Sequence, residues 1–425
     1  MKLAALVLCL LSAVVAKSQS DVGFQPDTLR MKLDSVETVF LRKNLMLLAQ
    51  RYNIDAQKAL VAQARLFPNP NLTVGTTLYQ TATKQFFPVG SNGEVSVGLS
   101  QLILLAGKHN KQIKIAQANA TLSEYQFYDL LRTLKHSLRT DFFNIHFLMQ
   151  SAAVYHTEIA ALQQVTDAFA QQKGKGYISE KEVIRVKAQL YDLQSEYNDL
   201  QMQLNDVQSE MRTLLQARNV FIAPDVDADA LAKLDPTRYP LAAVIDSAYA
   251  MRPDLKIAKL NSSLSTLNYK LQRAMGVPDL TINLNYDQQG GYVKNLTTLG
   301  FGVELPAFNR NQGNIKSAKA QIKYNEAMFD ATRAGVEEQV YNCLQRAFEN
   351  DKLLKSRDAS FEHDFDRLQA EVLKNYQVRN MSLLEFLDFY DSYKQNTLQI
   401  NAIQFNRVSA FEDLNFYSGV DYFKN

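Results

Sequence analysis

Residues 183–215, VIRVKAQLYDLQSEYNDLQMQLNDVQSEMRTLL, carry apolar side chains at alternating steps of three and four residues. The apolar positions are Val183, Val186, Leu190, Leu193, Tyr197, Leu200, Leu204, Val207, Met211 and Leu214. This spacing is the seam of a coiled coil, in which a helix packs along its length against a partner helix. A corresponding set follows near the C-terminus, namely Phe386, Phe389, Tyr393, Ile400, Ile403, Ala410 and Leu414. We therefore predict two long helices, each of which packs along its length against a partner helix.

The segments before these seams predict even longer helices. Residues 107–175 and 309–377 contain no proline and almost no glycine. Each would form one helix roughly 105 Å long at about 1.5 Å per residue. Residues 33–66, rich in closely spaced alanine, predict a further helix that ends at the prolines after Phe67. Helices of this length suit a long tube, whereas a compact globular core does not require them.

Four segments alternate between apolar and polar residues and predict β-strands. They pair into hairpins at residues 71–102 and 279–305, where for example Leu280, Ile282 and Leu284 alternate with polar neighbours. One apolar and one polar face is typical of a transmembrane β-barrel, with lipid outside and water inside. A half-buried sheet in a soluble domain shows the same alternation, so the strands alone leave both interpretations open.

The long helices favour the tube, and a tube-forming chain with four strands has to oligomerise. Four strands cannot close a barrel around water, and lipid does not tolerate an open sheet edge. Two, three or four copies would supply 8, 12 or 16 strands. Because an eight-stranded barrel is largely filled by side chains, a conducting pore requires at least three copies.

The sequence repeats itself once, at a distance of about 200 residues. Pro70–Val74 resembles Pro278–Ile282 at an offset of 208, and Lys111–Ala116 resembles Gly313–Ala318 at an offset of 202. Two copies indicate a duplicated domain and not a solenoid, which requires at least three. We predict that each repeat contains a helix, a β-hairpin and a long helical hairpin, and that the repeats are residues 19–225 and 226–425.

Residues 1–18 are expected to be a signal peptide and not part of the fold. Lys2 precedes the apolar run Leu3–Val15, and Ala16–Ser18 form a small-x-small cleavage site. The mature chain would begin near Gln19 and act outside the cytoplasm. No later stretch reaches 18 consecutive apolar residues, so no transmembrane helix is predicted.

Composition argues against several classes of function. With 46 Lys and Arg against 44 Asp and Glu, the net charge is +2 and gives no electrostatic footprint for nucleic acid. Two Cys and five His are too few to suggest a Cys/His metal site or a disulfide framework. Cys343 is predicted to be a small buried hydrophobe. The acidic run Asp225–Asp229 is followed by Ala230 and Pro236, where a calcium loop requires Gly and Glu. Without a nucleophile motif or phosphate loop, neither an enzyme nor a cofactor is predicted.

Two junction motifs carry a family resemblance. Residues 64–70, ARLFPNP, mark an entry from helix to strand and have a weaker copy at 274–280. Residues 305–315, LPAFNRNQGNI, mark an exit from strand to helix. With these motifs the chain resembles the TolC-like outer-membrane efflux proteins, the outer membrane factors, over essentially the whole mature sequence. The second motif resembles the CzcC-type heavy-metal efflux branch.

The resemblance implies an α+β membrane protein of the outer membrane that extends into the periplasm. Three chains would form a homotrimer, whose 12-stranded β-barrel, four strands per chain, continues as an α-helical coiled-coil tunnel. It implies contact with outer-membrane lipid, a periplasmic adaptor and an inner-membrane pump of the RND or ABC type. The duct would export metal cations. Multidrug or type I protein export is the alternative cargo, and a periplasmic coiled-coil scaffold is the alternative of a different class.

The resemblance also places functional residues at the two helix-turn-helix tips. The adaptor would dock on Gly176, Tyr177, Ile178, Ser179, Met381 and Ser382. Ser179 and Ser382 begin helices, so they also suit N-caps whether or not they contact an adaptor.

A periplasmic gate is implied next to these tips, formed by Glu385, Asp388, Glu182 and Tyr376. Glu385 and Asp388 are three residues apart and share a helix face, so three copies would form acidic rings. Two solvated surface acids are the simpler interpretation. Because Met381 stands where a basic partner is often found, we expect a gate that opens easily.

Overall fold

The computed structural model describes residues 27–174, 178–290, 292–357, 367–368, 371–372, 374–376 and 380–422. The chain divides into two compact units. Unit 1 comprises Met1–Phe40 and Asp141–Val226, and unit 2 comprises Leu41–Thr140 and Asp227–Asn425. The longest helix, α4 (Lys108–Gly174), contributes to both units. Its 67 residues confirm the helix predicted over 107–175.

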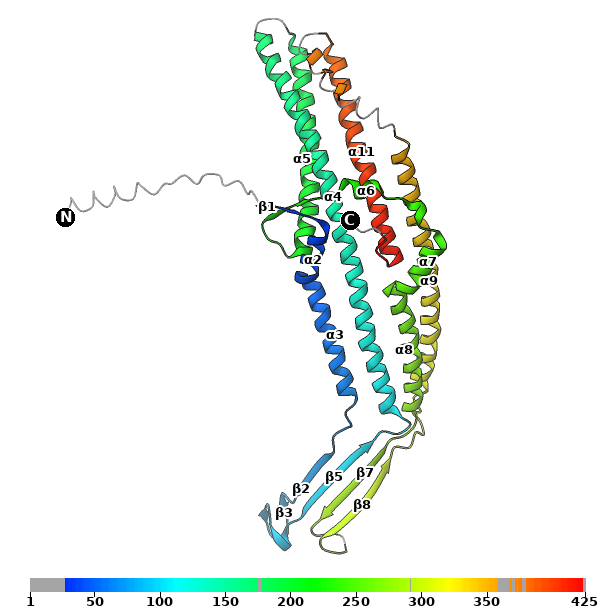
Figure 1. Ribbon diagram of the computed structural model, residues 1–425. Helices are drawn as coiled ribbons and strands as arrows, with labels where there is room; N and C mark the ends of the chain where they lie inside the picture. The colour runs from blue at the N-terminus through cyan, green and yellow to red at the C-terminus, as the bar shows by residue number, and fades with distance from the viewer. Residues whose placement is uncertain are drawn as a thin grey trace, which may run out of the picture. The chain divides into compact units, whose positions relative to one another are not determined.

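Unit 2 is built on a four-stranded antiparallel sheet (Figure 1). In spatial order its strands are β2 (Asn71–Thr76), β5 (Val95–Ile103), β7 (Leu280–Asp287) and β8 (Leu296–Val303). The connection from β2 to β5 contains a small hairpin and a 3₁₀ turn: β3 (Tyr79–Gln80), β4 (Gln85–Phe86) and η1 (Gly90–Asn92). Both predicted hairpins are confirmed, and the pairing of β5 with β7 joins them into one sheet.

The register places most apolar residues of the four strands on one face, with Leu102 and Leu296 as exceptions. Paired residues form a row of leucines across the sheet, namely Leu72, Leu99, Leu284 and Leu299. The neighbouring row, on the other face, is Thr73, Gly98, Asn285 and Thr298. The leucine row is exposed, most of all on the two edge strands, where Leu72 and Leu299 are each 62% exposed. The sheet therefore has an exposed apolar face and a polar face.

Helices connect to the sheet and pack on one another in unit 2. They are α3 (Leu45–Ala64), α6 (Ala228–Ala232), α7 (Leu241–Met251), α8 (Pro253–Met275), α9 (Gln312–Lys355) and α11 (Leu383–Ser418), with the 3₁₀ turn η2 (Pro236–Arg238). α8 runs along α9, and α9 also packs against α7 and α11 (Figure 1). No helix within the described ranges combines the length and the apolar character needed to cross a membrane.

Two predicted helices differ from the structure. The helix predicted over 33–66 is divided at Asn44 into α2 (Leu33–Lys43) and α3. Asn44 has an extended backbone, and its side-chain oxygen accepts the N–H groups of Met46 and Leu47 at 3.0 and 3.1 Å, which begins a new helix. The single helix predicted over 309–377 is wrong, because α9 ends at Lys355. Two lysines in its last turn complement the negative end of the helix dipole.

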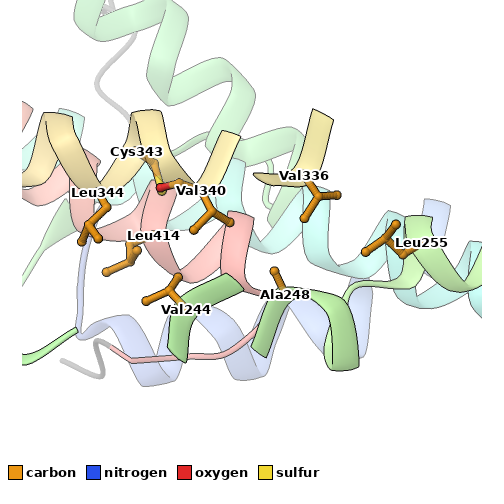
Figure 2. Packing of buried hydrophobic residues seen from close by; sticks show 8 residues of the cluster. All are labelled: Val244, Ala248, Leu255, Val336, Val340, Cys343, Leu344 and Leu414. Atoms are coloured by element: carbon orange, nitrogen blue, oxygen red, sulfur yellow. The ribbon is translucent and has the colours of Figure 1, made fainter. Parts of the chain in front are cut away.

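The core of unit 2 lies where α7, α8, α9 and α11 meet, as Figure 2 shows. Its buried members are Val244, Ala248, Leu255, Val336, Val340, Cys343, Leu344 and Leu414. Cys343 is 1% exposed, which confirms that it is a small buried hydrophobe. Burial raises the pKa of its thiol to about 12, because an apolar environment disfavours the thiolate.

Unit 1 contains α5 (Glu180–Leu215), which confirms the predicted seam. Most seam residues are buried, including Val183, Val186, Leu190, Leu193, Leu204, Met211 and Leu214. The hydroxyl of Tyr155 on α4 donates to Glu196 of α5 at 3.3 Å. Beyond α5, β6 (Val220–Pro224) pairs in parallel with β1 (Asp27–Met31).

Candidate functional site

The residues predicted to dock a partner and to form a gate belong to the tips of two helical hairpins. The first tip lies in unit 1 and the second in unit 2. Gly176 and Tyr177 lie outside the described residues. Ile178 and Met381 are half-buried, whereas the two serines that begin the following helices are exposed.

At the first tip, Ser179 begins α5 through a reciprocal pair of hydrogen bonds with Glu182. The backbone N–H of Glu182 donates to the Ser179 hydroxyl oxygen at 3.3 Å. The Glu182 carboxylate in turn accepts the Ser179 backbone N–H at 3.0 Å and the hydroxyl at 2.8 Å. This arrangement is a capping box, which satisfies N–H groups that a helix leaves unpaired at its start.

The second tip repeats this arrangement 203 residues later. The backbone N–H of Glu385 donates to the Ser382 hydroxyl at 3.2 Å, and the Ser382 N–H donates to the Glu385 carboxylate at 2.9 Å. Before the cap, the N–H of Asn380 donates to the carbonyl of Asn375 at 3.0 Å, which ties the two sides of the turn together. Both tips are therefore held by local hydrogen bonds.

The capping boxes keep the two glutamates charged. The hydroxyl and backbone N–H of Ser179 lower the pKa of the Glu182 carboxyl. The backbone N–H and hydroxyl of Ser382 lower the pKa of Glu385 in the same way. Both carboxylates are exposed, as is Asp388 one turn further along α11. The predicted gate acids of unit 2 thus form an exposed anionic surface on one helix face.

Tyr376, the fourth predicted gate residue, packs inside the second tip. Its ring stacks on the buried ring of Phe386, with centroids 4.3 Å apart and planes 17° apart. Phe386 also contacts Tyr390 at a centroid distance of 4.4 Å. The structure therefore brings Tyr376 to the turn of α11 that carries Glu385, while Glu182 belongs to unit 1.

An exposed ion pair links the two helices of the first tip. Lys173 at the end of α4 lies 2.7 Å from Glu180 at the start of α5. The hydrogen bond from Lys173 lowers the pKa of the Glu180 carboxyl. Because both side chains are exposed, this pair adds little stability and serves mainly to orient the turn.

Sequence reasoning found the serine half of each cap and missed the glutamate half. The spacing Ser-x-x-Glu at 179–182 and again at 382–385 is the sequence signature of a capping box. This spacing alone could have assigned both glutamates a structural role as capping residues, in addition to their predicted role in the gate.

Two buried ion pairs and one half-buried hydrogen bond in unit 2 were also missed. The ion pairs are Arg139 with Glu412 at 2.6 Å and Arg407 with Asp351 at 2.9 Å, and the hydrogen bond joins His136 to Asp413 at 2.9 Å. Burial raises the pKa of the Glu412 carboxyl, and the Arg139 guanidinium opposes this effect. No local pattern signals such pairs, because Arg139 and Glu412 are 273 residues apart.

A cavity of about 410 Å³ lies beside this layer, between α4, the start of α8 and the end of α11. The Arg132 guanidinium covers the Phe416 ring at 4.3 Å and donates to Asp129 at 2.8 Å. Lys135, on the same wall, lies 2.7 Å from Asp421. Arg132, Lys135 and Arg139 on this wall are paired with carboxylates, while the buried Nε of Arg132 has no hydrogen-bond partner in the described part of the chain and Lys256 also lines the cavity. Within the described ranges, no three His, Cys, Asp or Glu side chains are placed to hold a metal ion.

Residues 39–216 match the protein family described as "Outer membrane efflux protein". Over 343 residues the chain is 23% identical to the cobalt-zinc-cadmium resistance protein CzcC of Cupriavidus metallidurans. The aligned region covers 77% of this chain and 78% of CzcC.

Solved channel structures share the fold. CusC, whose structures describe folding and transmembrane channel formation, superposes with a TM-score of 0.72 at 15% identity over 95% of this chain and 96% of its own. The CmeC outer membrane channel of Campylobacter jejuni gives 0.72 at 14% identity, over 91% and 85%. The open state of the MtrE channel of Neisseria gonorrhoeae gives 0.68 at 15% identity, over 91% and 89%. At these identities the likeness establishes the fold.

Proposed function

We propose that this chain, whose residues 39–216 match the outer membrane efflux protein family, is an outer-membrane efflux protein and that three copies of it form the exit duct of a tripartite efflux system. The duct receives substrate from an inner-membrane pump through a periplasmic adaptor and releases it outside the cell. The family match confirms the resemblance that the junction motifs indicated. What we propose beyond this match is that three chains assemble, that their strands close a barrel and that their helix tips form a gate.

The two-faced sheet is the observation that carries the proposal. Its apolar face presents the exposed leucine row and its polar face presents Thr73, Gly98, Asn285 and Thr298. A membrane barrel needs this arrangement, with apolar side chains toward lipid and polar side chains toward water. Four strands per chain are too few to enclose a water-filled lumen, and three copies supply twelve.

The duplicated organisation fits the same assembly. Residues 19–225 and 226–425 are proposed as two copies of one repeat, each supplying two strands and one helical hairpin. The two capping boxes support this division, because they lie 203 residues apart, close to the offset between the two sequence repeats. Six repeats in a trimer would then surround the axis.

The gate is proposed at the second tip. Three copies bring Glu385 and Asp388 together as rings of carboxylates, with Glu182 and Tyr376 nearby. Two unit charges about 7 Å apart in water repel by roughly 0.6 kcal/mol, which packing or a bound cation can offset. In the single chain the hydrogen bonds from Ser382 lower the pKa of Glu385, which favours the charged carboxylate that such a ring requires.

The tips are proposed as the adaptor contact, through Gly176 to Ser179 on the first hairpin and Met381 and Ser382 on the second. Rigid, capped helix starts support this, since they present the turns in one conformation. An RND-type pump is the proposed inner-membrane partner, with an ABC transporter as the alternative.

Metal cations are the proposed cargo. The likeness to CzcC, whose name records cobalt, zinc and cadmium resistance, supports this choice. The polar row on the sheet is neutral and would pass other solutes as well, so drug or type I protein export is the alternative. Outer-membrane lipid surrounds the apolar face.

Deletion of the gene tests the function. We expect the deletion strain to become sensitive to cobalt, zinc or cadmium, and a plasmid copy to restore resistance. Sensitivity to drugs or detergents alone would favour the alternative cargo. In parallel, membrane fractions run on gels with and without heating should contain a heat-dissociable oligomer. A monomer recovered from the soluble fraction would contradict the duct.

A further inference from the structure

The cavity beside the buried ion pairs of unit 2 has the size and the lining of a ligand pocket. Its walls come from three helices of one chain, namely α4, the start of α8 and the end of α11, and all lining residues belong to unit 2. Its volume of about 410 Å³ falls within the roughly 300–1,000 Å³ of small-molecule sites. The cavity is therefore large enough for a small organic molecule.

Aromatic and apolar side chains supply much of this lining. Tyr125 and Tyr128 lie about one turn apart on α4, and Phe416 comes from α11. Leu131 and Met251 add further apolar surface. Rigid rings present flat apolar faces, which suit a planar aromatic molecule. Neither tyrosine hydroxyl has a hydrogen-bond partner in the described part of the chain, so both remain available as donors.

The charged groups of the lining leave one cation without a partner. Four permanently charged cations line the cavity, namely Arg132, Lys135, Arg139 and Lys256. Ion pairs with carboxylates neutralise the first three, at distances of 2.6, 2.7 and 2.8 Å. The imidazole of His136, which also lines the cavity, is hydrogen-bonded to Asp413 at 2.9 Å. Lys256 therefore leaves the pocket with one uncompensated positive charge.

The position of Lys256 strengthens its attraction for an anion. It is half-buried and lies in the first turn of α8, where the helix dipole is positive. Among the described residues it has no ion pair and no side-chain hydrogen bond. The acid of the same turn, Asp254, is bound by Arg252 at 2.5 Å. Because partial burial removes water from an ammonium, a bound anion would supply the partner that Lys256 lacks.

We propose that this cavity binds a small aromatic carboxylate, with the carboxylate on the Lys256 ammonium and the ring against the aromatic wall. An inorganic anion such as phosphate would leave the apolar wall unused. A metal cation would meet uncompensated positive charge, so the site does not suit the proposed metal cargo. The proposal goes beyond the duct, because every lining residue comes from a single chain.

A molecule in this cavity would contact three helices at once. The ion pairs of Lys135 and Arg139 already connect α4 to the end of α11, on the same wall of the cavity. Lys256 and Met251 bring in α8 and the end of α7. A ligand that binds only the folded chain stabilises it by mass action. Occupancy of the cavity should therefore raise the unfolding temperature of unit 2.

Equilibrium dialysis of naphthoate against the mature full-length protein in nanodiscs tests the proposal, with empty nanodiscs as the blank. We expect naphthoate to bind at least about tenfold more tightly than its neutral analogue naphthamide, because only the carboxylate forms a charge-assisted hydrogen bond. Inorganic phosphate at the same concentration should not displace it. Naphthamide binding as tight as that of naphthoate, or no binding of naphthoate above the blank, would overturn the proposal.

Substitutions of Lys256 test its role in the same assay. Lys256→Gln should weaken naphthoate binding about tenfold and abolish the preference over naphthamide. Lys259→Gln changes an exposed lysine on α8 that does not line the cavity, so it should leave binding unchanged. Lys256→Glu should reverse the preference, so that naphthylmethylammonium binds more tightly than naphthoate. Unchanged naphthoate binding in Lys256→Gln and Lys256→Glu would exclude Lys256 as the anion partner.

Thermal unfolding followed by circular dichroism gives a second readout and tests the cavity itself. Naphthoate should raise the unfolding temperature of the unchanged protein and of Lys259→Gln, and should not raise that of Lys256→Gln. Met251→Trp, which fills part of the cavity, should bind no naphthoate while its helical spectrum persists. Stabilisation that survives in both Lys256→Gln and Met251→Trp would place the ligand elsewhere and refute the proposal. A protein that binds naphthoate and forms no oligomer would contradict the duct alone.

Discussion

Arg139 and Glu412 form a two-pronged ion pair inside unit 2. Nε of Arg139 lies 2.6 Å from Oε2 of Glu412, and Nη2 lies 2.8 Å from Oε1. The side chains are 6% and 1% exposed, so neither charge has water to replace its partner. The pair therefore fixes α4 against α11, and it is stable only while both members are present.

Removal of one member of this pair should be strongly destabilising. We expect Glu412→Ala to lower stability by about 3–5 kcal/mol, because the buried guanidinium loses its partner. The apolar double variant Arg139→Met with Glu412→Leu should recover most of the loss. Urea unfolding followed by circular dichroism measures both. A double variant as unstable as Glu412→Ala would show that the pair acts through more than its charges.

The capping boxes should weaken in acid. The pKa values of Glu182 and Glu385 are lowered in the folded chain, so their stabilisation is complete above the ordinary glutamate pKa and is lost as the pH falls through the lowered values. Amide exchange in the first turns of α5 and α11, corrected for intrinsic rates, should therefore accelerate relative to mid-helix amides below about pH 4. Glu385→Gln keeps a capping side chain without a titrating charge, so the second tip of that variant should show no such change.

The acidic rings should make the closed duct cation-selective and sensitive to multivalent cations added on the periplasmic side. Because alanine at 385 would also remove a cap, the sharper variant is Glu385→Gln with Asp388→Asn, which removes charge and retains the capping box. In planar bilayers it should lose the block and lower the cation preference. Glu338→Gln, an exposed acid on α9, serves as the control. Unchanged block and selectivity in the double variant would place the gate elsewhere.

The tips should be essential for export and dispensable for assembly. Ile178→Asp places a charge at a half-buried position of the first tip, and Gly176→Pro restricts its turn. We expect both variants to lose efflux while the oligomer still reaches the outer membrane. Metal sensitivity and gel mobility, measured on the same cells, separate these effects. Normal efflux in both variants would exclude the first tip as the adaptor contact.

The sequence predicted those features that repeat along the chain. Periodicity was enough for the seam of α5 and for both β-hairpins, and the lack of proline and glycine was enough for α4, because each pattern extends over many residues. Single residues that interrupt a pattern were harder to predict: Asn44 divides a helix whose flanking residues both favour helix. Long-range partners such as Arg139 and Glu412 leave no local trace, since only the folded chain brings them together.

The join between the two hairpins makes the sheet depend on residues far apart in the sequence. Val97 pairs with Tyr286, and Lys108 pairs with Asp279, so the central seam of the sheet connects residues more than 170 positions apart. If the predicted signal peptide directs export from the N-terminus, the β2–β5 hairpin would leave the cytoplasm before its partner, and an isolated two-stranded hairpin is only marginally stable in water. Because β5 pairs with β7, the four-stranded sheet would form only after the second repeat had followed, and its first half would need protection from aggregation during that interval.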